Sequence, residues 1–142
     1  MSAPTITYFE DLSVGQEASV SNTVSEKDIQ LFAEVSGDRN PVHLDAGYAA
    51  TTMFKERIAH GMLSAAYISA VIGMELPGPG AIYISQSLSF RRPVKLGAEV
   101  KTRVEVKALD PDKGRATLAC VCSVEGKSVV EGEAVVMVPR KG

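Results

Sequence analysis

The chain has 142 residues, 45% of them apolar and 23% charged, which predicts one globular domain over residues 1–142 with a proper core. A net charge of −2 without a basic run argues against nucleic acid as the main partner. No apolar run reaches the length of a membrane span and the N-terminus lacks a signal-peptide pattern, so we expect a cytoplasmic protein with no membrane contact.

The first half of the chain predicts one strand and two helices. Residues 16–24 alternate between apolar and polar side chains, which is typical of a strand. A helix should follow, because Ser25 with Asp28 resembles a capping box and Gly37 can end the helix. Asp45 can cap a short helical turn, and a loop then extends to the next helix.

Residues 61–75 are the most apolar segment of the chain. Apolar side chains occur nearly all around the expected helix, which predicts a buried helix rather than an amphipathic surface helix. The segment is too short, and too rich in small polar residues, to span a membrane. Its small side chains permit close packing against a sheet, and the run 76–80, rich in Pro and Gly, ends it.

The remainder of the chain predicts antiparallel strands. Four segments alternate with a period of two: residues 81–90, 99–109, 115–124 and 128–138. Residues 110–114 and 125–127 have the composition of hairpin turns. One apolar face of such a sheet needs a cover, and the helix over 61–75 can supply it. We therefore expect an α+β hotdog fold, in which a curved antiparallel sheet wraps around one long buried helix.

The two cysteines predict core positions rather than a metal site. Cys120 and Cys122 are two residues apart on an alternating segment, so they should point to the same face of a strand. A metal site would need more ligands than these two thiols. We therefore expect reduced core cysteines and no bound metal.

Asp38 and His43 are five positions apart in the segment SGDRNPVH, which follows the first predicted helix. A carboxylate and an imidazole are the side chains that move protons near neutral pH. Gly37 ends the helix and Pro41 stiffens the loop, so both groups can be held on one small molecule. The alternative is that Asp38 is an ordinary turn residue and His43 a satisfied, half-buried histidine.

Three segments of the chain resemble the (R)-specific enoyl-CoA hydratases, also called MaoC-like hydratases. They are Phe32–His43, Ile58–Leu63 and Ser85–Phe90, and they occur in the family's order and spacing. The segment Leu76–Tyr83 resembles the short single-domain members that feed polyhydroxyalkanoate synthesis. The resemblance implies a single MaoC-like hotdog domain over residues 1–142, and hydration of a trans-2-enoyl-CoA to a (3R)-3-hydroxyacyl-CoA.

The resemblance also implies roles for individual residues. Asp38 and His43 would be the catalytic pair that activates one water, and the backbone N–H of Gly61 would bind the thioester oxygen. That last role agrees with the start of a helix, where unpaired N–H groups and the dipole favour an anion. Ser69 would lie by the active site or acyl pocket. The substrate is an acyl-CoA thioester, and no cofactor is expected because CoA is part of it.

Other polar residues are interpreted from the chain itself. Asn40 is expected to orient its neighbours through turn hydrogen bonds. By its spacing alone, Ser69 would be a core serine bonded to its own helix. We interpret His60 as holding the loop before the helix, with a second titrating group as the alternative. Arg91 and Arg92 are interpreted as an exposed pair, with contact to the phosphates of CoA as the alternative.

Other functions remain open from the residues. A 3-hydroxyacyl-(carrier protein) dehydratase would use the same groups, because the reaction is reversible. A hotdog thioesterase would usually lack the Asp-x-Asn-Pro-x-His loop. A non-catalytic acyl-CoA-binding module would not need paired proton-transfer groups. For each function we expect at least a homodimer, because one short sheet leaves an exposed edge strand.

Overall fold

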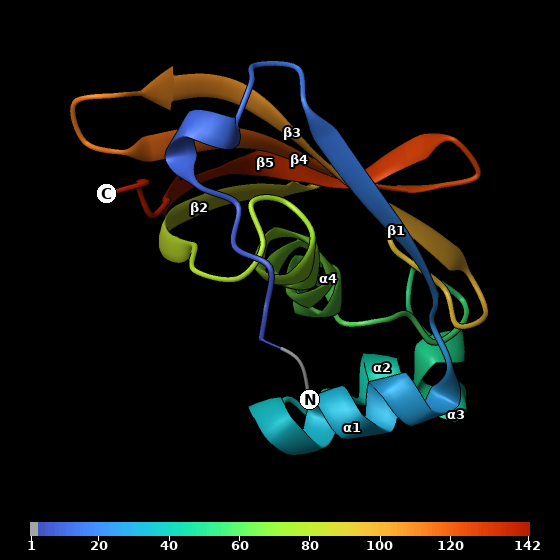
Figure 1. Cartoon of the computed structure of the whole chain (residues 1–142). Helices are drawn as coiled ribbons and strands as arrows, with labels where there is room; N and C mark the ends of the chain where they lie inside the picture. Colours follow the sequence, from blue (N-terminus) through green and yellow to red (C-terminus); the bar gives the residue numbers. More distant parts are fainter. Residues whose placement is uncertain (1–2) are drawn as a thin grey trace.

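The computed structural model describes residues 3–142, in which a curved antiparallel sheet wraps around a central helix (Figure 1). Within these residues the sheet has five strands in the order β1-β3-β4-β5-β2, and every neighbouring pair is antiparallel. The strands are β1 (Glu17–Thr23), β2 (Ile82–Phe90), β3 (Glu99–Asp110), β4 (Arg115–Val124) and β5 (Lys127–Met137). Each lies within a residue or two of its predicted segment, so the expected hotdog fold is confirmed.

Helix α4 (Gly61–Met74) lies against the sheet, and three further helices lie on its other side (Figure 1). They are α1 (Glu26–Ser36), α2 (Pro41–Leu44) and α3 (Ala46–Ala50), and a short 3-10 helix, η1 (Phe9–Asp11), precedes the first strand. The Ser25 and Asp28 capping box begins α1, as predicted. Helix α2 was not predicted, although Asn40 caps it and Pro41 occupies its first position, where proline is favoured.

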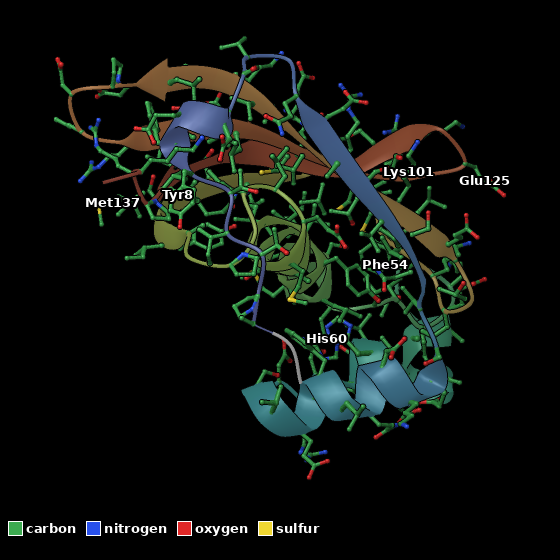
Figure 2. All side chains as sticks on the ribbon, in the orientation of Figure 1. Tyr8, Phe54, His60, Lys101, Glu125 and Met137 are labelled. Carbon is green, nitrogen blue, oxygen red and sulfur yellow. The ribbon has the colours of Figure 1, made fainter. Side chains whose placement is uncertain are left out.

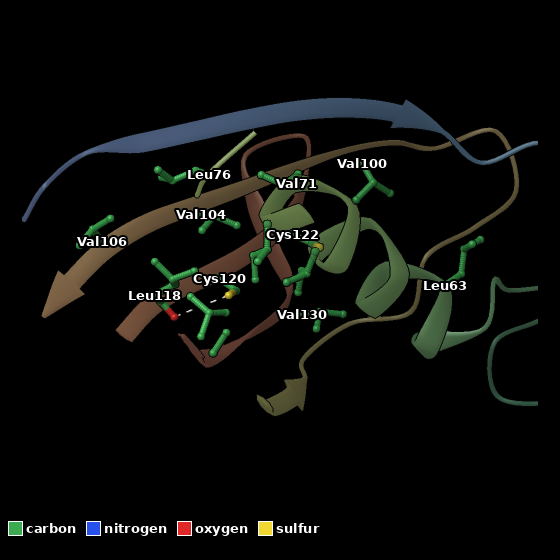
Figure 3. Close-up of a cluster of buried hydrophobic side chains, with 14 of the residues drawn as sticks. Leu63, Val71, Leu76, Val100, Val104, Val106, Leu118, Cys120, Cys122 and Val130 are labelled. Atoms are coloured by element: carbon green, nitrogen blue, oxygen red, sulfur yellow. Dashed lines mark hydrogen bonds between the residues drawn. The ribbon is translucent and has the colours of Figure 1, made fainter. Parts of the chain in front are cut away.

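The core fills the space between α4 and the inner face of the sheet (Figures 2 and 3). Alternate side chains of β3 and β4 point inward, which is the period-2 pattern of a half-buried sheet. Each large apolar side chain buried there contributes roughly 1.5–3 kcal/mol. Cys120 and Cys122 are free thiols in this core, as predicted. Other members are Leu63, Ile68, Val71, Val100, Val104, Val106 and Leu118.

Helix α4 is not buried on all sides, contrary to the prediction. One face is exposed and consists mostly of small residues and methionines: Met62, Ala66, Ser69, Ala70, Gly73 and Met74. Ser69 is therefore not a core serine in this chain. Hydropathy identifies surface that is stabilised by burial, but it does not distinguish burial by the same chain from burial by another.

Strand β2 is an edge strand whose apolar residues are exposed. The predicted alternation over residues 81–90 put Ile82, Ile84 and Phe90 on one inward face, but Ile82 and Ile84 are 54% and 42% exposed. Phe90 is 54% exposed, although its ring lies beside Gly61 of α4. The pairing of β2 with β5 shifts between Tyr83 and Ser85, so the alternation reverses partway along the strand. The other edge of β2 pairs with no strand among residues 3–142. Across these same residues no helix is long and apolar enough to cross a membrane.

Candidate active site

Local hydrogen bonds hold the loop between α1 and α2. Helix α1 ends at Gly37, whose φ of 78° is the left-handed conformation that glycine adopts without strain. The Asp38 N–H donates to Ser36 Oγ at 3.1 Å, and Asp38 Oδ1 accepts from the Asn40 N–H at 3.1 Å. Asn40 Oδ1 in turn accepts from the Val42 N–H at 3.1 Å. Asn40 thus makes the expected turn hydrogen bonds.

The imidazole of His43 is buried and its tautomer is fixed. Its Nδ1 lies 2.8 Å from the carbonyl oxygen of Ile58, which can only accept, so Nδ1 carries the proton and Nε2 has a lone pair. Burial lowers the pKa of His43, and the nearby imidazole of His60 lowers it further, against opposing contributions from Ile58 and Asp38. His43 is therefore a neutral base near pH 7.

His60 lies directly against His43, at the junction of α4 with the helices on its far side (Figure 2). The two ring centroids are 3.9 Å apart and the ring planes are inclined by 27°. His60 Nε2 lies 2.9 Å from the main-chain oxygen of Asp38. The prediction that His60 holds a loop needs a correction, because the loop it bonds is that of Asp38 rather than the segment just before α4.

Asp38, His43 and His60 each offer one possible metal-ligand atom, and these three atoms all lie within 4.8 Å of one another. Such ligand types suit zinc, but a zinc site needs lone pairs that converge on one point. The imidazoles are stacked, so their in-plane lone pairs run side by side. Nδ1 of His43 and Nε2 of His60 also donate hydrogen bonds to carbonyl oxygens, so neither nitrogen has a lone pair for a metal. This geometry fits a bound water and proton transfer better than a resident metal.

Gly61 begins α4 beside the two histidines. The side chain of His60, the N-cap residue, makes no capping hydrogen bond, which leaves the first-turn N–H groups available to a ligand. A Cβ on Gly61 would lie 2.8 Å from the ring of Phe90 at the end of β2. Only glycine fits here without movement of that ring. Because glycine has no side chain to cover the backbone, a ligand can approach the backbone closely.

A cavity of about 490 Å³ joins these groups. His43, His60 and Gly61 line it, and most of its remaining wall is apolar: Met53, Phe54, Phe90, Pro93, Val94 and Val130. This volume is within the usual range of small-molecule sites. Asp38 borders His43 without lining the cavity, and Ser69 lies outside it on the exposed face of α4.

Met53 and Phe54 were not predicted as lining residues. They lie in a loop without periodicity, and two large apolar side chains among polar neighbours were the only signal. Arg91 and Arg92 also line the cavity and are exposed, as predicted. Arg91 Nε lies 2.9 Å from Glu131 Oε1, and Arg92 Nη1 donates to the Ser128 carbonyl at 2.6 Å.

Residues 11–131 match the family model described as "MaoC like domain". The (R)-specific enoyl-CoA hydratase of Rhodospirillum rubrum is 57% identical over 135 residues, which span 95% of this chain and 94% of that protein. The unliganded R-hydratase of Pseudomonas aeruginosa superposes with a TM-score of 0.91 at 55% identity, covering 96% of this chain and 88% of that one. The (R)-hydratase of Aeromonas caviae involved in PHA biosynthesis gives 0.89 at 47% identity, covering 92% and 99%.

Proposed function

This chain belongs to the MaoC-like family, and on that premise we propose that it hydrates a trans-2-enoyl-CoA to a (3R)-3-hydroxyacyl-CoA. It is an enzyme of the hydratase type, a carbon–oxygen lyase. The observation that carries the proposal is one mostly apolar cavity that joins a neutral imidazole, a free helix N-terminus and, beside them, the loop of Asp38.

The relatives favour this function over the alternatives. The Rhodospirillum protein, at 57% identity, is named for an enoyl-CoA substrate rather than a carrier-protein thioester. A module that only binds acyl-CoA would have no use for a carboxylate and an imidazole held against one cavity. The PHA role of the Aeromonas relative suggests polyhydroxyalkanoate supply as the pathway.

We propose that the substrate enters with its thioester oxygen at the N–H of Gly61. As water adds, negative charge develops on that oxygen in the enolate. The unpaired first-turn N–H groups and the dipole of α4 stabilise this charge where it forms. The apolar wall around Phe54 and Val130 receives the acyl chain, because it removes hydrocarbon from water.

The catalytic water lies between Asp38 and His43 in this proposal. His43 Nε2 and the Asp38 carboxylate each accept one water hydrogen, which leaves an oxygen lone pair for C3. His43 takes the proton as the C3–O bond forms and the C2–C3 double bond becomes an enolate. The imidazolium then returns that proton to C2, so one water supplies both the hydroxyl and the hydrogen.

No cofactor is required by this mechanism, since the carbonyl is polarised by backbone N–H groups and the protons move through side chains. We propose that the enzyme needs no metal, because the stacked imidazoles do not converge on one ion. Activity should be unchanged after dialysis against a chelator, and restoration of lost activity by zinc would contradict this.

We propose that the working unit is a homodimer. The exposed apolar residues of edge strand β2 and the small-residue face of α4 are the surfaces a second copy would bury. Light scattering beside chromatography, with activity measured across the same dilution series, tests this. A fully active species near 15.1 kDa would overturn it.

Both cysteines are free thiols, in keeping with the reducing cytoplasm that we propose as its compartment.

The experiment that tests the function is loss of the enoyl-thioester absorbance with crotonyl-CoA and longer homologues. The product should support NADH formation with a dehydrogenase specific for (3R)-hydroxyacyl-CoA, and none with a (3S)-specific enzyme. NADH with the (3S)-specific enzyme would refute the stereochemistry. Turnover restricted to a carrier-protein thioester would refute the CoA substrate.

A further inference from the structure

His60 is buried against two other rings. It is 2% exposed, its imidazole stacks on His43 of α2, and it meets Phe32 of α1 at a tilt of 55°. The ring centroids are 4.9 Å apart on the Phe32 side and 3.9 Å apart on the His43 side. The ring that starts α4 therefore contacts both helices that flank the loop of Asp38.

The one side-chain hydrogen bond of His60 among residues 3–142 is made to that loop rather than to its own helix. The main-chain oxygen of Asp38 can only accept, so the proton of His60 is on Nε2, which lies 2.9 Å away. His60 Nδ1 is buried and has no hydrogen-bond partner in residues 3–142. As the N-cap residue it makes no side-chain cap, although capping is the usual use of a polar side chain there.

This is a poor arrangement for stability alone. A serine or aspartate at this position would cap α4 and leave no buried nitrogen unpaired, whereas His60 does neither. Its observed contacts instead reach both members of the catalytic pair. One contact is the hydrogen bond to Asp38, and the other is the stack on His43.

We propose that His60 is a positioning residue of the reaction, holding Asp38 through its Nε2–H and the ring of His43 by stacking. This inference rests on the proposed hydratase function and adds a third residue to it. The bond holds the carbonyl of Asp38, whose N–H is held by Ser36 Oγ, and the stack prevents rotation of His43 away from the shared water. Displacement of a reacting group by about 1 Å can cost on the order of 10²-fold in rate.

Two variants separate the two contacts. His60→Gln retains an N–H donor but removes the ring, and His60→Phe retains a flat ring but removes the donor. Each should lower kcat by about 10–10²-fold, with KM changed by no more than about threefold, because the Gly61 N–H and the apolar residues proposed to bind the substrate are not themselves replaced. Val106→Ala, in the core away from the site, is the control for lost stability and should retain kcat.

A double-mutant cycle tests whether His60 acts through Asp38. In an Asp38→Asn background, His60→Phe should cost no more than about threefold, because the group that it positions is already disabled. Equal losses in both backgrounds would overturn the proposal. So would kcat within twofold of the parent for both His60 variants.

The pH profile adds an independent readout of the contact between His60 and His43. The charged and titratable groups near His43 are Asp38, Asp45, Arg57, Glu26 and His60. His60→Gln removes one neighbour that lowers the pKa of His43, so the acid limb of kcat/KM should move to higher pH. An unmoved limb would contradict contact between the rings in solution. An inactive parent enzyme would refute the function itself, whereas an active parent with unimpaired variants refutes only the role of His60.

Discussion

Nδ1 of His43 donates a 2.8 Å hydrogen bond to the carbonyl oxygen of Ile58, which lies 15 residues later in the chain. Ile58 is itself fixed, because its N–H reaches the Val42 carbonyl at 3.3 Å and it forms a bridge with Lys95. A segment without regular structure thus sets the tautomer of His43. The consequence is a lone pair on Nε2, which can accept a proton from a bound water.

Replacement of either member of the pair should lower kcat steeply. Asp38→Ala and His43→Ala are each expected to lose about 10²–10⁴-fold, the usual contribution of general acid–base catalysis. If both groups act on one water, as proposed, the double variant should lose little more than either single variant. Stopped-flow absorbance on folded proteins measures this, and near-parental turnover of His43→Ala would refute the mechanism.

The acid limb of kcat/KM should lie below pH 6.5, the ordinary pKa of a histidine. Burial lowers the pKa of His43, so the imidazole stays neutral, and able to accept a proton, to lower pH than a solvated histidine. Activity should be retained through pH 6.5 and lost as the pH falls further. The limb can be assigned by NMR titration of His43, and an NMR pKa above 6.5 would be inconsistent with the structure.

Two substitutions at Gly61 separate the effect of losing its N–H from the effect of adding a side chain. Gly61 occupies the first position of α4 and His60 has ψ of 134°, a conformation that tolerates a following proline. In a Phe90→Ala background the clash with a Cβ is removed. In that background, kcat of the Gly61→Pro variant should be about 10²–10³-fold lower than kcat of the Gly61→Ala variant. The two differ in that the proline variant lacks the backbone N–H donor.

Both proteins in that comparison should melt at similar temperatures, since proline is favoured at the first position of a helix. Equal turnover of the proline and alanine variants would show that the Gly61 N–H does not bind the thioester oxygen. The remaining candidate donor would then be the next N–H of the same turn.

The thiols should be inert in the folded protein. Cys120 and Cys122 are both fully buried, and burial raises the pKa of Cys120 to about 11 and that of Cys122 as well. Because the thiolate is the reactive form, iodoacetamide at pH 8 should label neither residue until denaturant is added. Mass spectrometry measures the labelling, and rapid modification of the native protein would be inconsistent with this core.

Arg57 links α1 to the helix of His43. Its Nη atoms bond both carboxylate oxygens of Glu26 at 2.6 and 2.8 Å, and its Nε donates to the His43 carbonyl at 2.7 Å. The bond from Arg57 lowers the pKa of Glu26 to about 2. A carboxyl with a lowered pKa stabilises the fold above its unfolded pKa and loses that effect as the pH falls. The Tm deficit of Glu26→Gln should therefore be largest above pH 5 and vanish near pH 2.

The sequence predicted the features that depend on local rules. Alternation with a period of two predicted β4 over its full observed range, and the Ser25 capping box with Gly37 predicted both ends of α1. The spacing of Asp38 and His43 on a stiff loop predicted two proton-transfer groups, and the structure brings their polar atoms within 4.8 Å of each other. Helix α2 was missed, although Asn40 and Pro41 carried its signal.

Local sequence patterns do not predict which distant segment of the chain covers a given side chain. The chain alone gave no reason to place His60 against His43, because that contact needs α4 to begin beside α2. The exposure of Ile82 and Ile84 depends on β2 lying at the sheet edge and on the shifted pairing after Tyr83. That of Ser69 depends on which face of α4 the sheet covers. Hydrophobic periodicity shows which apolar side chains share a face, but it does not show what covers that face.

Most helices and all five strands, together with the fold class, follow from sequence patterns alone, and the proposed proton-transfer pair was chosen on the same basis. Backbone propensity, capping and hydrophobic periodicity act over a few residues, so they can be read along the chain. Tertiary structure alone decided the tautomer of His43, the stack with His60 and the cavity at Gly61. Each of these joins residues distant in sequence, and their hydrogen bonds and van der Waals contacts exist only after the sheet has closed around α4.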